Sequence, residues 1–495
     1  MRSIGIIRTV CDLRTMCFTM VGILSAVFGI TGCAVGPDYV KPETATPSGW
    51  QEVFDPAPAA DGQTLSEWWK VFHDPLLTEL IVEAKKSNLD LRQAVARVKE
   101  ARAQFGLISG ERFSRVDATG EVNRSRLSEN DRQPGGATTS RYGTGLDLSW
   151  EIDLFGRIRR SVEAAAADFE ASAEDYHDVM ITLSAEVAKT YLLLRTFQMR
   201  LASSIGNIES QKQILQLTRS RFKYGLATDL DVAQAEEVFA SSEAELPPLR
   251  ANITQAMNNL ALLLGKYPGA LSETLGSEAA IPVVPEYVAM GVPADLLRRR
   301  PDIRSAEREL AAQTARIGVA TADLYPRFSL AGSFGWAALD SGDVLHRDSR
   351  EWNLIPGVRW NVFDAGRIRS QITVEDARTE QALARYERIV LTALNEVENS
   401  LKAYREERIR VSALERSVAA AQRTLRLSTK LYKEGLADFQ NVLDAQRSLF
   451  SFENQLAEAR GTTAVHLVTV YRALGGGWTI PAEPDGETPT SASET

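Results

Sequence analysis

The chain contains a long internal duplication. Residues 148–159 resemble residues 358–369, and residues 222–227 resemble residues 432–437, both at an offset of 210 residues. One offset shared by two distant matches indicates a duplicated structural unit rather than a chance motif. A duplication of about 200 residues is much longer than the repeats of solenoid proteins. The sequence therefore predicts two similar halves packed in a pseudosymmetric body.

Composition excludes several classes of function. The 495 residues carry a formal net charge of −9, and no apolar run reaches 18 residues. We therefore expect neither a nucleic-acid-binding protein nor a membrane-spanning helix. The four histidines are scattered without metal-ligand spacing, and the chain lacks the G-x-S-x-G, phosphate-loop and H-E-x-x-H motifs. We expect no enzyme activity and no metal site.

Residues 1–32 have the features of an export signal. Three arginines accompany a short apolar run over residues 16–30, and the sequence Ile-Thr-Gly directly precedes Cys33. Small residues before a cysteine are typical of a bacterial lipoprotein signal, in which the thiol receives lipid. We expect Cys33 to become the first residue of the mature chain and to carry S-diacylglycerol and an N-acyl group such as palmitate. An ordinary signal peptide with an incidental cysteine is the alternative.

Two hairpins of long strands are predicted, at about 113–153 and about 325–364. In each hairpin, apolar residues alternate with polar ones over two runs. Strands of about ten residues with one apolar face suit a transmembrane β-barrel, and a soluble β-sandwich is the alternative. Pro356 is unusual in a strand, because it cannot donate a ladder hydrogen bond, and it is a candidate for a bulge.

A long helix is predicted after each hairpin, over residues 156–224 and 366–434. Neither tract contains proline, and apolar residues recur every seven positions, a pattern typical of a left-handed supercoil. A helix of about 68 residues spans about 100 Å. Gly225 and Gly435 are expected to end these helices, since glycine readily adopts the positive φ found just past a helix end.

The predicted domain organisation is an α+β chain built around two repeats. Return helices are expected over 228–264, kinked at Pro247 and Pro248, and over 438–474. The segments in order are a signal peptide 1–32, a lipid-anchored lead and equatorial segment 33–75, a first repeat 76–270, a crossover and equatorial segment 271–300, a second repeat 301–475, and a disordered tail 476–495.

The strands of one chain cannot form a complete barrel. Four strands are too few, since the smallest membrane barrels have about eight. An open sheet edge is not tolerated in lipid, because its unpaired backbone groups find no water there. Several chains must therefore share one barrel, with the long helices continuing as a hollow cylinder, and this architecture predicts a conduit rather than an enzyme.

Five motifs resemble those of one family. They are CAVGPDY at 33–39, WEIDLFGR at 150–157, RRPDI at 299–303, YP at 325–326 and FDAGR at 363–367. In these motifs, spread over most of the mature chain, the sequence resembles the TolC-like outer-membrane efflux proteins, in the lipoprotein branch typified by OprM and NodT.

The resemblance implies an assembly and a function. It implies a homotrimer with a shared 12-stranded transmembrane barrel and a long α-helical tunnel in the periplasm. The implied partners are a periplasmic membrane-fusion adaptor, an inner-membrane transporter of the RND class and outer-membrane lipid. The implied function is passive conduction of small toxic compounds or drugs in a tripartite efflux pump. An outer-membrane conduit for type I protein secretion is the alternative, and the sequence does not name the substrate.

The resemblance also implies a gate near the two helical turns. The turns would contact the adaptor through Gly225, Leu226, Ala227, Gly435, Leu436 and Ala437. The residues matching the periplasmic gate are Asp231, Tyr432, Asn441 and Asp444. One acidic-ring position is thus an asparagine, and the family's arginine is replaced by Ala437. Helix capping by Asp229, Asp231 and Asp438 is compatible with this role, and an apolar gate at Leu436 or Leu443 is the alternative.

Overall fold

The computed structural model describes residues 34–51, 65–126, 138–285 and 292–479, together with Ser128 and Asn130. The predicted signal peptide 1–32, the proposed lipid site Cys33 and residues 480–495 lie outside the described residues. The chain divides into two compact units. The sheet unit comprises the described residues up to 42, 99–171 and 307–385, and the helical unit comprises those in 43–98, in 172–306 and from 386 onward.

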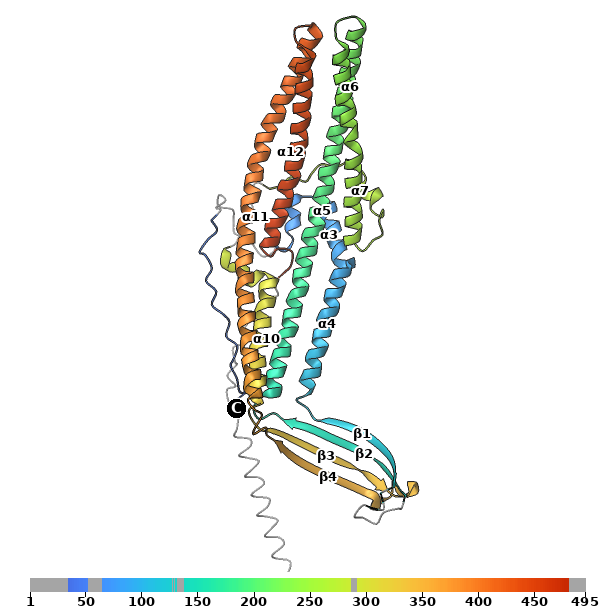
Figure 1. Cartoon of the computed structure of the whole chain (residues 1–495), viewed down its shortest axis with the longest axis vertical. Coiled ribbons are helices and arrows are strands. Elements are labelled where there is room, and N and C mark those ends of the chain that lie inside the picture. The colour runs from blue at the N-terminus through green and yellow to red at the C-terminus, as the bar shows by residue number, and fades with distance from the viewer. Residues whose placement is uncertain are drawn as a thin grey trace, which may run out of the picture. The chain divides into compact units, whose positions relative to one another are not determined.

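The sheet unit contains one antiparallel sheet of four strands in the order β1-β2-β3-β4. The strands are β1 (Arg115–Arg126), β2 (Thr138–Ile152), β3 (Arg327–Ala338) and β4 (Arg350–Arg359). Figure 1 shows them side by side in one curved layer. The two hairpins of the duplicated halves are therefore joined through the pairing of β2 with β3.

The strand register gathers the apolar residues on one face. Leu146 pairs with Phe334, and Phe334 pairs with Trp352. In the adjacent row, Asp147 pairs with Ser333. Because neighbouring side chains of a strand point to opposite faces, one face of the sheet is apolar and the other is polar. Leu146, Phe334 and Trp352 are 50%, 47% and 75% exposed, so the apolar face is uncovered within the described chain.

Pro356 makes no bulge. It pairs with Leu330 in an unbroken register between β3 and β4. Strand β4 is at one end of the sheet, and proline is tolerated on such an edge strand.

The long helices are continuous. Helix α5 (Arg157–Lys223) has 67 residues and α11 (Arg367–Glu434) has 68, so each is about 100 Å long at about 1.5 Å per residue. Their shorter counterparts α4 (Leu89–Gly110) and α10 (Pro301–Ala322) precede the two hairpins.

The seven-residue apolar repeat forms the buried side of α5 and α11. Val187 and Leu194 of α5 are fully buried, as are Val397 and Tyr404 of α11. The repeat is exposed again at the far end of α5, where Phe222 is 46% exposed. The hydrophobic period thus sets which side of each helix packs inward.

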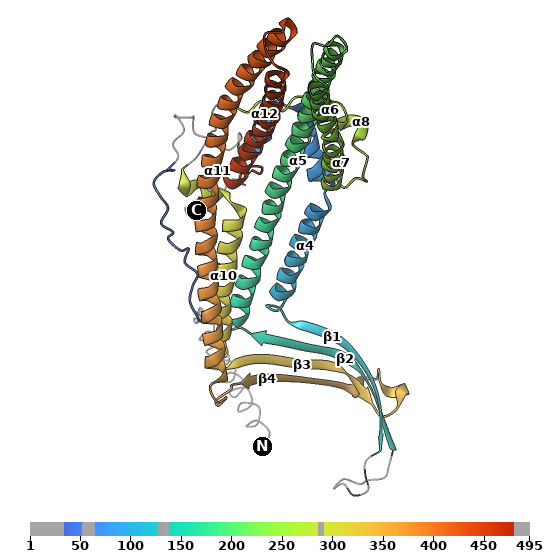
Figure 2. The same cartoon turned by 45° about the horizontal axis from the view of Figure 1, so that its top comes forward.

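The remaining elements complete the helical unit and the turns of the sheet unit. They are η1 (Trp68–Phe72), α3 (Pro75–Ser87), α6 (Asp229–Ala244), α7 (Leu246–Leu263), α8 (Ser272–Leu275), η2 (Pro293–Asp295), α9 (Leu296–Arg299), η3 (Ser341–Asp343), η4 (Arg347–Ser349) and α12 (Phe439–Ala473). Figures 1 and 2 show α6 folded back along α5 and α12 folded back along α11.

The first return helix is divided in two, where the sequence predicts one kinked helix over 228–264. Helix α6 ends at Ala244 and α7 begins at Leu246, with Glu245 between them. Pro247 and Pro248 follow at once. Proline lacks the amide that a helix interior needs but is tolerated in a first turn, so the pair starts a new helix instead of bending the old one.

The core of the helical unit forms around an aromatic cluster. Trp68 is fully buried and stacks on Tyr471 with ring centroids 5.6 Å apart. Asp74 caps α3 by accepting hydrogen bonds from the amides of Leu76 and Leu77. Its second oxygen accepts a hydrogen bond of 2.6 Å from the hydroxyl of Tyr191 on α5. Helix α3 is thus fixed to α5 by the same residue that starts it.

The predicted tail 476–495 begins too early. Trp478 is 6% exposed, stacks on His177 at 4.4 Å and donates a hydrogen bond to the carbonyl of Arg299. Gly475 and Gly477 have positive φ angles of 74° and 114°, which allow the chain to turn back after α12. Residues 476–478 are therefore part of the packed helical unit.

None of the described helices combines the length and the low polarity that crossing a bilayer requires.

Candidate functional site: the helical turns and the polar cluster

The two turns between the long helices and their return helices have the same geometry. Gly225 and Gly435 have φ angles of 72° and 76°. The amide of Leu226 donates to the carbonyl of Arg221 at 2.8 Å, and that of Leu436 donates to Leu431 at 2.9 Å. Each glycine amide also donates to the carbonyl three residues earlier. These are Schellman motifs, which end a helix through a left-handed glycine.

Each turn exposes an apolar side chain. Leu226 is 63% exposed and Leu436 is 72% exposed. A Cβ atom built on Gly225 or Gly435 would meet no atom within 4 Å, so backbone conformation, not crowding, requires glycine there. The two turns present a leucine and a bare backbone in the same way.

The helices just behind the turns pack in one small core. Its buried members are Ile214, Leu215, Ala235, Val238, Tyr432, Phe439, Val442 and Leu443. They come from α5, α6, α11 and α12, so both hairpins contribute. Arg447 of α12 adds an ion pair of 3.0 Å with Glu237 of α6. The turns are therefore held together within one chain.

The structure does not bring Asp231 and Tyr432 together within the chain. The carboxylate of Asp231 accepts a hydrogen bond of 2.7 Å from the amide of Thr228, whose hydroxyl accepts one from the amide of Asp231. This reciprocal pair is a capping box at the start of α6. Tyr432 is 4% exposed, and its hydroxyl has no hydrogen-bond partner among the described residues.

Arg221 contacts Tyr432 where Asp231 does not. Its guanidinium lies 4.6 Å from the centre of the Tyr432 ring, and it donates a hydrogen bond of 3.1 Å to the carbonyl of Lys433. Arg221 thus links the end of α5 to the end of α11. Sequence reasoning missed this residue, because an arginine in the last turn of a helix also has the ordinary role of interacting with the helix dipole.

Asn441 and Asp444 lie on the exposed side of α12. They line a groove against α11 together with Ser417, Ala420, Ala421, Thr424, Ala445, Ser448 and Phe452. Gln440 donates a hydrogen bond of 3.0 Å to Asp444. Asp438 is the first flanking residue of α12, but its side chain makes no capping hydrogen bond.

The two leucines of the alternative apolar gate have different environments. Leu443 is 1% exposed and packs in the core behind the turns, whereas Leu436 is 72% exposed. Of the two, only Leu436 is free to line an opening in the described chain.

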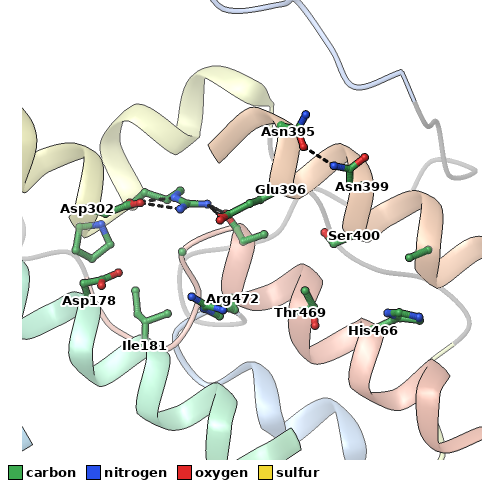
Figure 3. A pocket seen from close by; sticks show the side chains of 15 residues that line it. Asp178, Ile181, Asp302, Asn395, Glu396, Asn399, Ser400, His466, Thr469 and Arg472 are labelled. Atoms are coloured by element: carbon green, nitrogen blue, oxygen red, sulfur yellow. Dashed lines mark hydrogen bonds and ion pairs between the residues drawn. The ribbon is translucent and has the colours of Figure 1, made fainter. Parts of the chain in front are cut away.

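A second polar site surrounds Arg300 at the start of α10. Its guanidinium makes two hydrogen bonds to Asp302, of 3.0 and 2.7 Å, and one of 2.7 Å to Glu396. It also donates to the carbonyl of Ala473 at 3.1 Å. Figure 3 shows these contacts at one side of a cavity of about 480 Å³. Arg300 therefore ties α10, α11 and α12 together.

Asp178 of α5 faces the same cavity (Figure 3). Burial raises the pKa of its carboxyl above the ordinary value of 3.8, and the charge of Asp302 adds to this effect while Arg300 opposes it. In the described part of the chain, no group of three or more His, Cys, Asp or Glu residues is placed to hold a metal ion.

The geometry of two repeats, each a hairpin followed by a long helix and a Schellman turn, matches a known family. The model of the outer membrane efflux protein family matches residues 80–266 and 292–476. The chain belongs to this family. As an outer-membrane efflux channel, it has the location, function and TolC-like α+β fold that the sequence predicts, and the relatives confirm these predictions.

The efflux channel has relatives that match over nearly their whole length. Nodulation protein T of Rhizobium leguminosarum bv. trifolii is 33% identical over 451 residues, which cover 91% of this chain and 95% of that protein. The solvent efflux pump outer membrane protein SrpC of Pseudomonas putida is 34% identical over 466 residues, covering 92% and 97%. The solved structure of the outer-membrane channel OprN is 36% identical with a TM-score of 0.85, covering 90% of this chain and all of that one.

Proposed function

We propose that this chain is the exit duct of a tripartite pump that expels small toxic compounds. The supporting observation is the four-stranded sheet, whose apolar face is exposed and whose two end strands have no further partner in the described chain. An edge of this kind is unstable in lipid. Three copies placed edge to edge would close twelve strands into one barrel, with the polar face lining a conduit.

The trimer is tested by the mass of the purified protein in detergent. We expect the mass of three mature chains, because three copies remove every open edge. A species of one, two or four chains as the stable form would contradict the proposal.

The outer-membrane anchor is proposed to be lipid on Cys33. The support is the small-residue sequence before this cysteine after a short apolar run. Two or more acyl chains are needed for firm membrane attachment, and a diacylglycerol with an N-acyl group meets this need. Mass spectrometry of the mature N-terminus tests the proposal, which an unmodified terminus at another residue would contradict.

The proposed partners are a periplasmic adaptor, which would contact the two exposed turns, and an RND-class inner-membrane transporter, which would supply the energy. The name of the relative SrpC, a solvent efflux pump outer membrane protein, supports small toxic compounds as substrates. The duct itself is proposed to be passive, with no catalytic residues and no cofactor beyond the lipid.

Deleting the gene tests substrate class and separates the two candidate functions. The efflux proposal predicts greater sensitivity to solvents, dyes or antibiotics in the deletion strain, restored by the wild-type gene, with an unchanged set of secreted proteins. Loss of a secreted protein without any change in sensitivity would favour type I protein secretion instead.

We propose that the mouth of the duct closes at Asp231, Tyr432, Asn441 and Asp444. Since Asp231 is held in its own helix cap, a bond to Tyr432 would have to form between neighbouring copies and would compete with this cap. Asp444, exposed on α12, would form a ring of three negative charges that attracts cations.

Single-channel recording in planar bilayers tests the gate. Tyr432→Phe and Asp231→Ala are expected to raise conductance if they release a tie between copies, and Asp444→Ala is expected to remove block by divalent cations. Thr228→Ala is the matched control for Asp231→Ala, because it weakens the same cap without removing a carboxylate. Equal traces for all variants would move the gate to apolar residues such as Leu436.

A further inference from the structure

The first described residues lie against the junction between β2 and α5. The amide of Val35 donates a hydrogen bond of 3.1 Å to the carbonyl of Phe155. A Cβ atom built on Gly156 would lie 2.6 Å from the Cβ of Ala34, and Gly156 has a φ of 84°. Glycine is thus required at the junction both by its conformation and by the contact with Ala34.

Arg160 of α5 binds the next residues. Its side chain is 5% exposed. Its guanidinium donates hydrogen bonds to the carbonyls of Val35 at 3.2 Å and Gly36 at 3.3 Å. It also forms an ion pair of 2.6 Å with Asp38. The planar, multiply donating guanidinium suits this convergence of acceptors, and a buried arginine is almost always paired in this way.

A close backbone approach holds the same segment to α10. Gly36 has a φ of 90°, and a Cβ built on it would lie 2.4 Å from the Cα of Gly318. A Cβ built on Gly318 would lie 2.8 Å from Cγ of Arg160. Two glycines from opposite ends of the sequence therefore make room for one another and for the arginine.

Glu307 of α10 binds the end of the segment. It accepts a hydrogen bond of 3.0 Å from the hydroxyl of Tyr39 and pairs with Lys41 at 3.0 Å. Burial alone would raise the pKa of Glu307, but the hydrogen bonds from Arg308 and Lys41 bring it below the ordinary value. The carboxylate is therefore charged at neutral pH.

We propose that these residues form a binding site for the chain's own segment 34–41, here called the strap, which seats the start of the mature chain beside the β2–α5 junction. An anchor that served only as a tether would need no such site. Residue 33 is about 3.8 Å in Cα distance from Ala34, so the lipid proposed for Cys33 would enter the membrane next to β2. Arg160 acts as a positioning residue, and the strap links α5 of the first repeat to α10 of the second.

A spin label on the strap tests the site. Val40 is 80% exposed, so Val40→Cys carries a label without disturbing the contacts. It is the only free thiol if Cys33 is lipidated, since the other two cysteines lie in the signal. We expect restricted label motion in the otherwise wild-type trimer and rapid motion in Arg160→Gln. The matched control is Arg316→Gln, which removes the ion pair between Arg316 and Asp168 and should leave the motion restricted.

Further variants keep the test decisive if Arg160→Gln fails to assemble. Gly36→Val and Asp38→Ala change the strap alone, and both should release the label. Restricted motion in these variants and in Arg160→Gln, or rapid motion in the wild-type background, would overturn the proposal. The result is separable from lipidation, on which the role of the strap as an anchor seat rests. Repeating the measurement with Cys33→Ser should leave the label restricted, whereas an unlipidated terminus would refute only the anchor.

Discussion

At the scale of single residues, Arg300 is the most connected side chain of the polar cluster. Its guanidinium is bound by two carboxylates and a carbonyl from three helices. Arg300→Gln would leave Asp302 and Glu396 without their shared cation. Removing one partner of a buried ion pair costs about 3–5 kcal/mol. We expect about 2 kcal/mol here, because the Glu396 side chain is 48% exposed.

Thermal unfolding of the trimer in detergent measures this loss. The control is Arg385→Gln, which removes the exposed pair between Arg385 and Glu309 and should cost less than about 1 kcal/mol. Equal melting of the two variants would show that Arg300 does not act as a hub.

Asp178 gives a pH-dependent prediction. Its pKa is raised in the folded protein, so its contribution to stability is fully present below about pH 4 and is lost as pH rises through the folded pKa. Asp178→Asn removes the cost of burying the charge. We therefore expect the variant to melt above wild type at pH 7, with the difference disappearing near pH 4. A constant difference across this range would contradict the assignment.

Residue roles were the least predictable part of the site. Asp231 and Tyr432 lie near the turns as their positions in the sequence suggest, but their side chains belong to a capping box and a hydrophobic core. An aspartate three residues into a helix has both a capping and a recognition role available, and the sequence does not separate them. The contact of Arg221 with Tyr432 depends on two helices that are 211 residues apart in sequence, which no local pattern reports.

At the scale of elements, the two Schellman turns should respond alike to substitution. Gly435→Ala places a Cβ in the left-handed region, which costs about 1–2 kcal/mol. The same change at Gly206, inside α5, meets no atom within 4 Å and should stabilise by about 0.5–1 kcal/mol. Hydrogen exchange of the Leu436 amide, which bonds to Leu431, should quicken only in Gly435→Ala. Equal exchange in both variants would argue against the turn geometry.

The elements themselves were largely readable from the sequence. The duplication, the period of two in the strands and the period of seven in the helices place β1–β4, α5 and α11 near their observed ends, because these patterns follow directly from which side of an element is buried. The division of α6 from α7 and the packing of Trp478 were not readable. Each depends on a local contact, with two prolines in a first turn and with His177 respectively.

At the scale of the whole molecule, the apolar face of the sheet and the open edges of β1 and β4 point to assembly. A single chain leaves Trp352 75% exposed, which is costly in water and favourable only against lipid or another protein. The trimer, the shared barrel and the strap at the β2–α5 junction all follow from the need to cover this face and these edges.

The central claim is that the assembled protein is a water-filled passage, and current through single molecules tests it most directly. Purified trimer in a planar lipid bilayer should give discrete, repeatable current steps, and their size should rise when the turns are weakened by Gly435→Ala. A bilayer that remains electrically silent, although mass measurement shows inserted trimer, would contradict the account.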